Sequence, residues 1–359
     1  MMIPTTYAVA LGLTVLTMLC WGSWANTMKM SGKWRFELFY FDYTLGLFLA
    51  ALIAALTFGS YEMETVVDSA TPAFSFLDNM AIGSKRSMAY AAAGGVIFNL
   101  ANLLLVAAIA IAGLSVAFPV GIGIALIVGT LLNYMLKPSG SPTLLFGGAS
   151  VILVAIIVTA MAHSAYAKSK ARAAAPAVAA GNRAMLNKRG PSPVKGIVIS
   201  VVSGILMGLF YPLVELSKRG DLGMGPYAAT FCFAVGVLLS TPLFNLFFMN
   251  LPVEGEPVGF MEYFKGTTKQ HLLGLLGGAI WSIGMVSNIV ASSAGKSATV
   301  GPAVSYAIGQ GATLVSTLWG LLLWKEFAGA DSKVRGLILL MLALFVGGLA
   351  MLSLAPLYK

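Results

Sequence analysis

The stretch GGVIFNLANLLLVAAIAIAGLSVAFPVGIGIALIVGTLLNYML, residues 94–136, decides the fold class. It belongs to an apolar run from Ser87 to Leu136. That run is too long for one crossing, because a helix rises about 1.5 Å per residue and a crossing takes about 20 residues. We therefore divide it at Ala112-Gly113 into two predicted spans. Transmembrane β-strands show polar/apolar alternation over about 10 residues, so these unbroken apolar runs predict α-helices.

The composition of the whole chain leads to the same class. Of 359 residues, 58% are apolar and 10% are charged, against about 45–50% and about 25% in soluble domains. These values exclude a soluble enzyme, a disordered chain and a disulfide-stapled secreted domain. We expect an all-α polytopic membrane protein with ten transmembrane helices. The predicted spans are residues 7–27, 38–59, 88–111, 114–136, 143–163, 195–217, 226–249, 271–293, 298–324 and 334–355.

The net charge of +9 is better explained by basic loops on the anionic side of a membrane than by nucleic-acid binding. Most Lys and Arg residues fall in the loops that follow odd-numbered spans, which places these loops in the cytoplasm and both termini outside. The longest of them, residues 164–194, is a basic linker expected to be attracted to anionic lipid. It lacks the G-x-x-x-x-G-K-[ST] spacing of a phosphate-binding loop. No basic segment precedes the first span, so we expect that span to be retained in the plasma (inner) membrane.

The two halves of the chain resemble each other at a fixed spacing. In the third and fourth spans of each half, the matching residues are 183 positions apart, and in the first spans the match is looser. The matches are Gly94-Gly95 with Gly277-Gly278, Pro119 with Pro302, Thr130-Leu131 with Thr313-Leu314, and Gly22 with Gly208. Five spans per half is an odd number, so the sequence predicts two inverted five-helix repeats, at residues 1–163 and 195–359. Such repeats are typical of transporters that work by alternating access.

Polar side chains inside a bilayer are candidates for a binding site, because burying them in lipid is costly. Amides, hydroxyls and indoles are neutral donors and acceptors, so together they suit a neutral, planar, hydrogen-bonding solute. The alternative is that such side chains join helices to one another, and the sequence leaves both open. The predicted substrate-binding residues are Trp21, Trp24, Asn99, Asn102, Tyr211, Trp281, Asn288, Tyr306 and Gln310.

Two acids within spans are candidate proton carriers. Asp42 lies about one turn inside the second span, a depth that suits reversible protonation. Its alternative role is an ion pair with Arg35 or Lys33 at the cytoplasmic interface. Glu215 lies near the outer end of the sixth span, where its alternative partners are Lys218 and Arg219.

Two prolines at equivalent positions are candidate hinges. Pro119 and Pro302 each lie about four residues into a predicted span, where a proline either starts a helix or frees a carbonyl and permits bending. Their equivalence under the 183-residue spacing favours the hinge. His163 and His271 fall at span ends without the companions that a metal site requires, so we expect neither a metal nor a cofactor.

Several segments carry a family resemblance. WGSWANTMKMSGKWRFELFYFDYTLGLFLAALIAALTFG (21–59) resembles the first two spans of the ureide permease family, and residues 94–136 resemble its next helical pair. AHSAYAKSKA (162–171) and KGIVISVVSGILMGLFYPLV (195–214) are similar to the segments that flank its central loop. STLWGLLLWKEF (316–327) resembles the wider drug/metabolite transporter superfamily. The chain resembles a bacterial-type member, without the nucleotide-loop-like motif that plant members carry.

The resemblance implies ten helices in two inverted repeats, with the termini outside and the central loop in the cytoplasm. It also implies proton-coupled import of allantoin and related heterocyclic nitrogen compounds. Sugar-uptake porters of the same superfamily share the W-G-S start and the final K-E, so a sugar porter is the alternative. A receptor or membrane enzyme is disfavoured, because the sequence has no soluble catalytic or signalling domain. The expected partners are a small-molecule substrate, protons and membrane lipid, and no oligomeric state is predicted.

Overall fold

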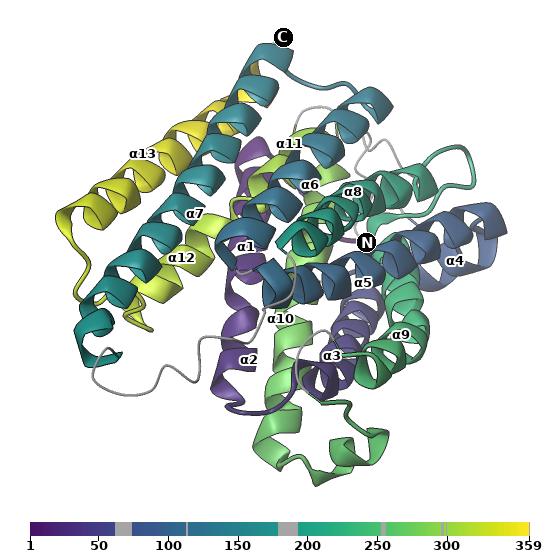
Figure 1. Cartoon of the computed structure of the whole chain (residues 1–359). Coiled ribbons are helices and arrows are strands. Elements are labelled where there is room, and N and C mark those ends of the chain that lie inside the picture. The colour runs from purple at the N-terminus through teal and green to yellow at the C-terminus, as the bar shows by residue number, and fades with distance from the viewer. Residues whose placement is uncertain are drawn as a thin grey trace.

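The computed structural model describes residues 1–61, 74–112, 114–178, 193–252, 256–295, 298 and 300–358. Within these residues all regular secondary structure is helical (Figure 1). Nine helices of this described part are long and apolar enough to cross a membrane, which confirms the polytopic all-α class. They are α1 (Tyr7–Ser23) with α2 (Ala25–Met30), α3 (Phe36–Leu56), α5 (Lys85–Ala112), α6 (Leu114–Leu136), α7 (Pro142–Val178), α8 (Pro193–Ser217), α9 (Pro226–Asn250), α10 (Thr268–Ser292) and α13 (Ser332–Leu354).

The ninth predicted span, residues 298–324, consists of two shorter helices. α11 (Pro302–Gly309) and α12 (Ala312–Leu322) are separated at Gln310-Gly311. α11 begins at Pro302, directly after Gly301, whose φ of 76° is a left-handed conformation that glycine adopts without strain. The count of ten spans therefore stays a prediction. The remaining elements are α4 (Phe76–Ile82), η2 (Phe260–Lys265) and η3 (Ala355–Leu357).

Local sequence explains where several helices begin. The Thr267 hydroxyl accepts from the backbone N–H of Gln270, whose side chain accepts from the Thr267 N–H, so α10 starts with a capping box. The Asp331 side chain caps the N-terminus of α13 by accepting from the backbone N–H of Val334. α7 continues into the predicted linker as far as Val178, because Ala, Lys and Arg are strong helix formers. The rest of that linker, up to residue 192, lies outside the described residues.

The helices pack in a pattern that recurs between the halves of the chain. α5 packs against α8 and α9, and α10 packs against α1 and α3. α6 lies against α8, and α12 lies against α1. α7 and α13 run side by side at the left of Figure 1. Replacing each helix by the one five predicted spans away turns the α5–α8 pair into α10–α1, the α5–α9 pair into α10–α3, and the α6–α8 pair into α12–α1. The α7–α13 pair corresponds to itself.

Glycines let the backbones touch where α3 crosses α10. A Cβ on Gly46 would lie 2.0 Å from the carbonyl oxygen of Leu275, and one on Gly278 would lie 1.8 Å from that of Tyr43. Neither distance leaves room for a side chain, because real Cβ contacts are hardly ever below 3.0 Å. Small residues of this kind allow close helix association in membranes.

The crossing of α5 and α9 has the same arrangement. A Cβ on Gly236 would lie 2.1 Å from the carbonyl oxygen of Ala92, and one on Gly95 would lie 2.0 Å from that of Phe233. Both crossings therefore consist of two glycines, one on each helix, facing two backbone carbonyls.

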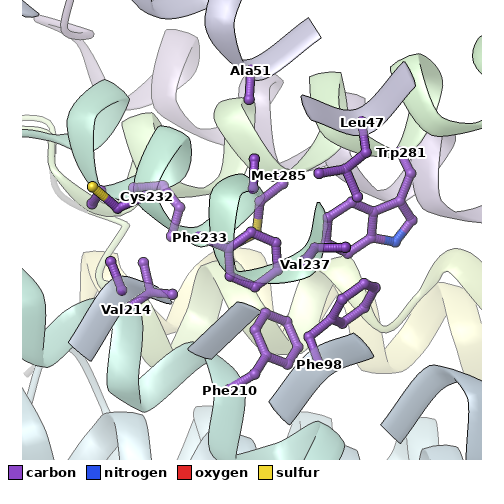
Figure 2. Packing of buried hydrophobic residues seen from close by; sticks show 14 of the residues in the cluster. Leu47, Ala51, Phe98, Phe210, Val214, Cys232, Phe233, Val237, Trp281 and Met285 are labelled. Carbon is purple, nitrogen blue, oxygen red and sulfur yellow. The ribbon is translucent and has the colours of Figure 1, made fainter. Parts of the chain in front are cut away.

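Aromatic side chains fill the space between these crossings. Figure 2 shows the rings of Phe98, Phe210, Phe233 and Trp281 gathered in one buried cluster. The ring centres of Phe98 and Trp281 are 4.3 Å apart, and those of Phe233 and Trp281 are 5.8 Å apart. This cluster joins α5, α8, α9 and α10. A second buried cluster joins α7 and α13 to α11.

Candidate functional site

A cavity of about 470 Å³ lies between α1–α2, α5, α6, α7 and the segment from α12 to Glu326. Its wall combines apolar side chains with amides, hydroxyls, indoles and a few ionisable groups. Ligand pockets commonly have volumes of about 300–1,000 Å³, so this cavity is large enough for a small molecule. The polar and aromatic lining residues are Trp24, Asn26, Lys29, Asn102, Thr159, His163, Thr313, Ser316, Thr317, Trp324 and Glu326.

Three of the residues singled out by the sequence line this cavity: Trp24, Asn102 and Pro119. The Asn102 side chain donates from Nδ2 to the Tyr40 hydroxyl at 3.2 Å. The Trp24 ring lies 4.9 Å from the ring centre of Tyr43. Pro119 lies inside α6 as its sixth residue, whereas its counterpart in the other half starts a helix.

Asn99, one turn from Asn102, lies in a helix-joining network instead. Its Oδ1 accepts from the Tyr40 hydroxyl at 2.8 Å, and its Nδ2 donates to Ser240 Oγ at 2.8 Å and to Thr241 Oγ1 at 3.1 Å. The residue is fully buried. These contacts join α3, α5 and α9, which is the structural role that the sequence left open.

Trp21 and Trp281 stack on each other between α1 and α10, with ring centres 5.6 Å apart. The Trp21 indole donates to the Trp281 carbonyl oxygen at 3.2 Å. Trp281 belongs to the aromatic cluster of Figure 2, and Trp21 packs against it. Neither lines the cavity described above.

Three of the four remaining candidates, Tyr211, Asn288 and Tyr306, lie in a second buried network between α8, α10 and α11. The Tyr211 and Ser305 hydroxyls are 3.2 Å apart, and Asn288 Nδ2 donates to the Ser305 carbonyl oxygen at 3.0 Å. Tyr306 donates to backbone carbonyls of α6 and α8. Gln310 is buried where α11 gives way to α12. None of these four candidates lines the cavity.

Several cavity residues were not among the sequence candidates. The Trp324 indole donates to Asn26 Oδ1 at 2.7 Å. Lys29 forms an ion pair with Glu326, and its Nζ lies 4.7 Å from the Trp324 ring centre. The His163 ring lies against Phe327 in the wall formed by α7. Trp324 and Glu326 could have been found from the sequence as an aromatic and a charged residue at the end of the ninth predicted span.

Asp42 lies outside the cavity, in a cluster at the start of α3. Its Oδ1 accepts from the Tyr263 hydroxyl at 2.5 Å, and its Oδ2 lies 2.8 Å from His271 Nδ1. Arg35, one of the two alternative partners, forms an ion pair with Glu37. Burial, followed by the hydrogen bond to Asp42, raises the pKa of Tyr263 above its ordinary value. Asp42 therefore links α3 to α10 and to η2.

Glu215 is held in a buried ion pair at the end of α8. Lys218 Nζ lies 2.6 Å from its Oε1, and the Ser292 hydroxyl donates to the same oxygen at 2.9 Å. Lys218 also donates to Ser293 Oγ at 2.9 Å. Burial lowers the pKa of Lys218 and repulsion from Lys137 adds to this, while Glu215 opposes both. The structure thus pairs Glu215 with Lys218, one of the two partners that the sequence offered.

A metal site is not formed by the residues that the structure describes, since no three His, Cys, Asp or Glu side chains come together among them. Long apolar helices around a cavity of mixed polar and aromatic lining define a multi-pass membrane protein with room for a small molecule. The sequence pattern of the Ureide permease family matches residues 39–184 and 167–355. The chain belongs to that family, which is one of transporters and not of enzymes.

Two plant relatives cover nearly the whole chain, and a third relative covers about half of it. Ureide permease 1 of Arabidopsis thaliana is 26% identical over 96% of this chain and 96% of its own length. Ureide permease 4 of the same plant is 25% identical over 98% of each. Transmembrane protein 144 homolog B of Dictyostelium discoideum is 27% identical over 47% of this chain and 44% of its own. A solved crystal structure of a protein superposes with a TM-score of 0.54 at 18% identity over 97% of each chain, which shows a shared fold.

Proposed function

We propose that the chain imports neutral, flat, amide-rich nitrogen compounds of the ureide type through the cavity of about 470 Å³. The observation that carries this proposal is that one cavity is lined both by an amide, Asn102 of α5, and by an indole, Trp24 at the junction of α1 and α2. An indole stacks on a flat ring, and an amide matches the donors and acceptors of a ureide. The family match supports this substrate class, and it does not support the sugar-porter alternative.

The transport mechanism we propose is alternating access between two inverted five-helix repeats, residues 1–163 and 195–359, joined by the linker 164–194. The glycine crossings support it. Gly95 and Gly278 are 183 positions apart. Gly236 faces Ala92 and Gly46 faces Leu275. Ala92 and Leu275 are again 183 positions apart. Equivalent helices thus cross at equivalent residues, as two copies of one bundle would. In this proposal α11 and α12 together form the ninth span, and Pro119 of α6 and Pro302 of α11 are the hinge pair of the two repeats.

Proton coupling is assigned in this proposal to Asp42. A carboxylate that bonds to both an imidazole and a phenol has two groups with which it can exchange a proton. The residue after Asp42, Tyr43, packs its ring against Trp24 of the cavity wall. Glu215, the second acid, is engaged with Lys218, and its role in proton movement stays a prediction. We further propose that the protein lies in the plasma membrane with both termini outside and the cavity in its cytoplasmic half.

The test is uptake of labelled allantoin into liposomes that contain the purified protein, with and without an imposed pH gradient. We expect concentrative uptake that depends on the gradient and is not inhibited by hexoses. Asn102→Ala should raise the KM for allantoin about tenfold, the loss expected for one buried hydrogen bond. Asn250→Ala is the matched control, since that exposed amide bonds only to its own helix. Binding of allantoin without any flux would contradict transport, and equal KM values for the two variants would remove the cavity from the proposal.

A further inference from the structure

Buried polar atoms without a partner are concentrated at one end of α6. The described residues contain six buried side-chain oxygens that make no hydrogen bond. Three of these are Thr130 Oγ1, Asn133 Oδ1 and Ser139 Oγ, within ten positions of each other. Thr130 and Asn133 are 1% and 0% exposed. Such atoms are rare and need an explanation, because they have lost their bonds to water without replacement.

The position of these residues in the repeat provides the explanation. Thr130 and Asn133 stand 183 positions before Thr313 and Ser316, which line the open cavity. The face of α6 that carries Thr130 and Asn133 therefore corresponds to the face of α12 that lines the open cavity. In one half of the chain this face is exposed to a cavity, and in the other half it is enclosed.

A sealed ion pair lies next to the enclosed face. Gly22 and Gly208 are 186 positions apart, and the same spacing relates Lys29 to Glu215. Lys29 and Glu326 at the open cavity have side chains that are 45% and 37% exposed, whereas those of Lys218 and Glu215 are 10% and 6% exposed.

The sealed pair is also tied to its surroundings. Ser292 and Ser293 of α10 and the turn after it bond to the pair. Arg219, the next residue after Lys218, donates to the carbonyl oxygen of Leu136 at the end of α6. The pair therefore holds the ends of α8 and α10 together, and Arg219 beside it adds the end of α6.

We propose that Thr130 and Asn133 line a second access path, closed in this structure, and that the Glu215–Lys218 pair is the gate that closes it. This inference rests on the proposed alternating access. When the gate opens, the path opens on the membrane side opposite to the present cavity, and the two side chains regain hydrogen bonds to water or solute. At the same time the cavity around Ser316 closes, because the two paths alternate.

The test is the reactivity of single cysteines with a charged methanethiosulfonate that cannot cross membranes. The native thiols are first removed by Cys20→Ala and Cys232→Ala. Asn133→Cys then probes the proposed path, and Ser316→Cys probes the open cavity as its matched control. Each is labelled in sealed membrane vesicles of both orientations, so that the control defines which side the cavity faces.

With the gate intact, we expect Ser316→Cys to react from one side and Asn133→Cys to react slowly from either. Adding Glu215→Gln leaves Lys218 as an unpaired buried charge, which destabilises the closed gate enough for a rate change of about tenfold or more. Asn133→Cys should then react at least about tenfold faster, from the side opposite to the control. Ser316→Cys should react more slowly in the same gate variant.

This opposite movement of the two rates separates gating from unfolding, since a loosened fold would speed up both. Any other combination overturns the proposal, including acceleration of both cysteines, no change, or labelling of Asn133→Cys from the same side as the control. Because the assay contains no solute, it is independent of whether allantoin is the substrate. Failure of uptake with the expected labelling would overturn the ureide proposal alone.

Discussion

The close crossing of α3 and α10 gives a prediction whose size follows from the structure. Gly278→Ala would place a methyl group 1.8 Å from the Tyr43 carbonyl oxygen, where an ordinary contact is 3.4 Å or more. The obstructing atom belongs to the backbone, so no rotamer change relieves the clash and the helices must move apart by well over an ångström. Overpacking of an interior costs about 1–3 kcal/mol and occasionally more. We expect a loss of about 3 kcal/mol in the free energy of unfolding, at the upper end of that range.

The matched control is Gly347→Ala on α13, where a Cβ would meet nothing within 4 Å. This change should stabilise the protein by about 0.5–1 kcal/mol, because alanine favours a helix over glycine. The assay is thermal unfolding in detergent, followed with a thiol-reactive dye that reaches the buried Cys232 on unfolding. Gly95→Ala, at the equivalent crossing, should lower the midpoint by a similar amount. Equal midpoints for Gly278→Ala and Gly347→Ala would refute the claim that the two backbones touch.

Three further predictions concern the polar groups. Asn99→Ala should lower the unfolding midpoint and leave the KM for allantoin unchanged, because it removes three buried hydrogen bonds that join helices, at about 1–3 kcal/mol in total. A raised KM with an unchanged midpoint would contradict this. Asp42→Asn should abolish the response of uptake to a pH gradient while retaining a bond to His271, and a variant with the wild-type response would clear Asp42 of coupling. The raised pKa of Tyr263 means that its bond to Asp42 stabilises the fold below pH 10.0, the ordinary value, and is lost as the pH rises through the folded value. The difference in unfolding midpoint between wild type and Tyr263→Phe should therefore be constant at neutral pH and shrink in strong alkali.

The class of fold could be predicted because it depends on lengths of apolar sequence alone. Nine of the ten predicted spans correspond to a long helix of the described chain. The break at Gln310 was not predictable, since glycine occurs throughout these helices without interrupting them. Membrane helices of this kind are apolar on nearly all sides, so periodicity does not show which face meets a neighbour.

The site was harder to predict for the same reason. Asn99 and Asn102 lie three positions apart on one helix face, yet only Asn102 reaches the cavity, because Tyr40 stands between them and bonds to both. The contact between Asp42 and His271 joins residues 229 positions apart. No local pattern encodes such a contact. The spacing of 183 residues was the one long-range signal in the sequence, and the glycine crossings follow it.

The two helices of the interrupted span, α11 and α12, differ in how extensively they pack against the rest of the protein. All eight residues of α11 are buried, among α1, α6, α7, α10 and α13, whereas α12 packs chiefly on α1. α12 is about 16 Å long at 1.5 Å per residue, so a tilt of about 10° about Gln310 carries its far end by about 3 Å. That end leads to Trp324 and Glu326 in the cavity wall. A small tilt of α12 about Gln310 would therefore widen or narrow the cavity near Trp324 and Glu326, while α11, which is buried on all sides, keeps its position.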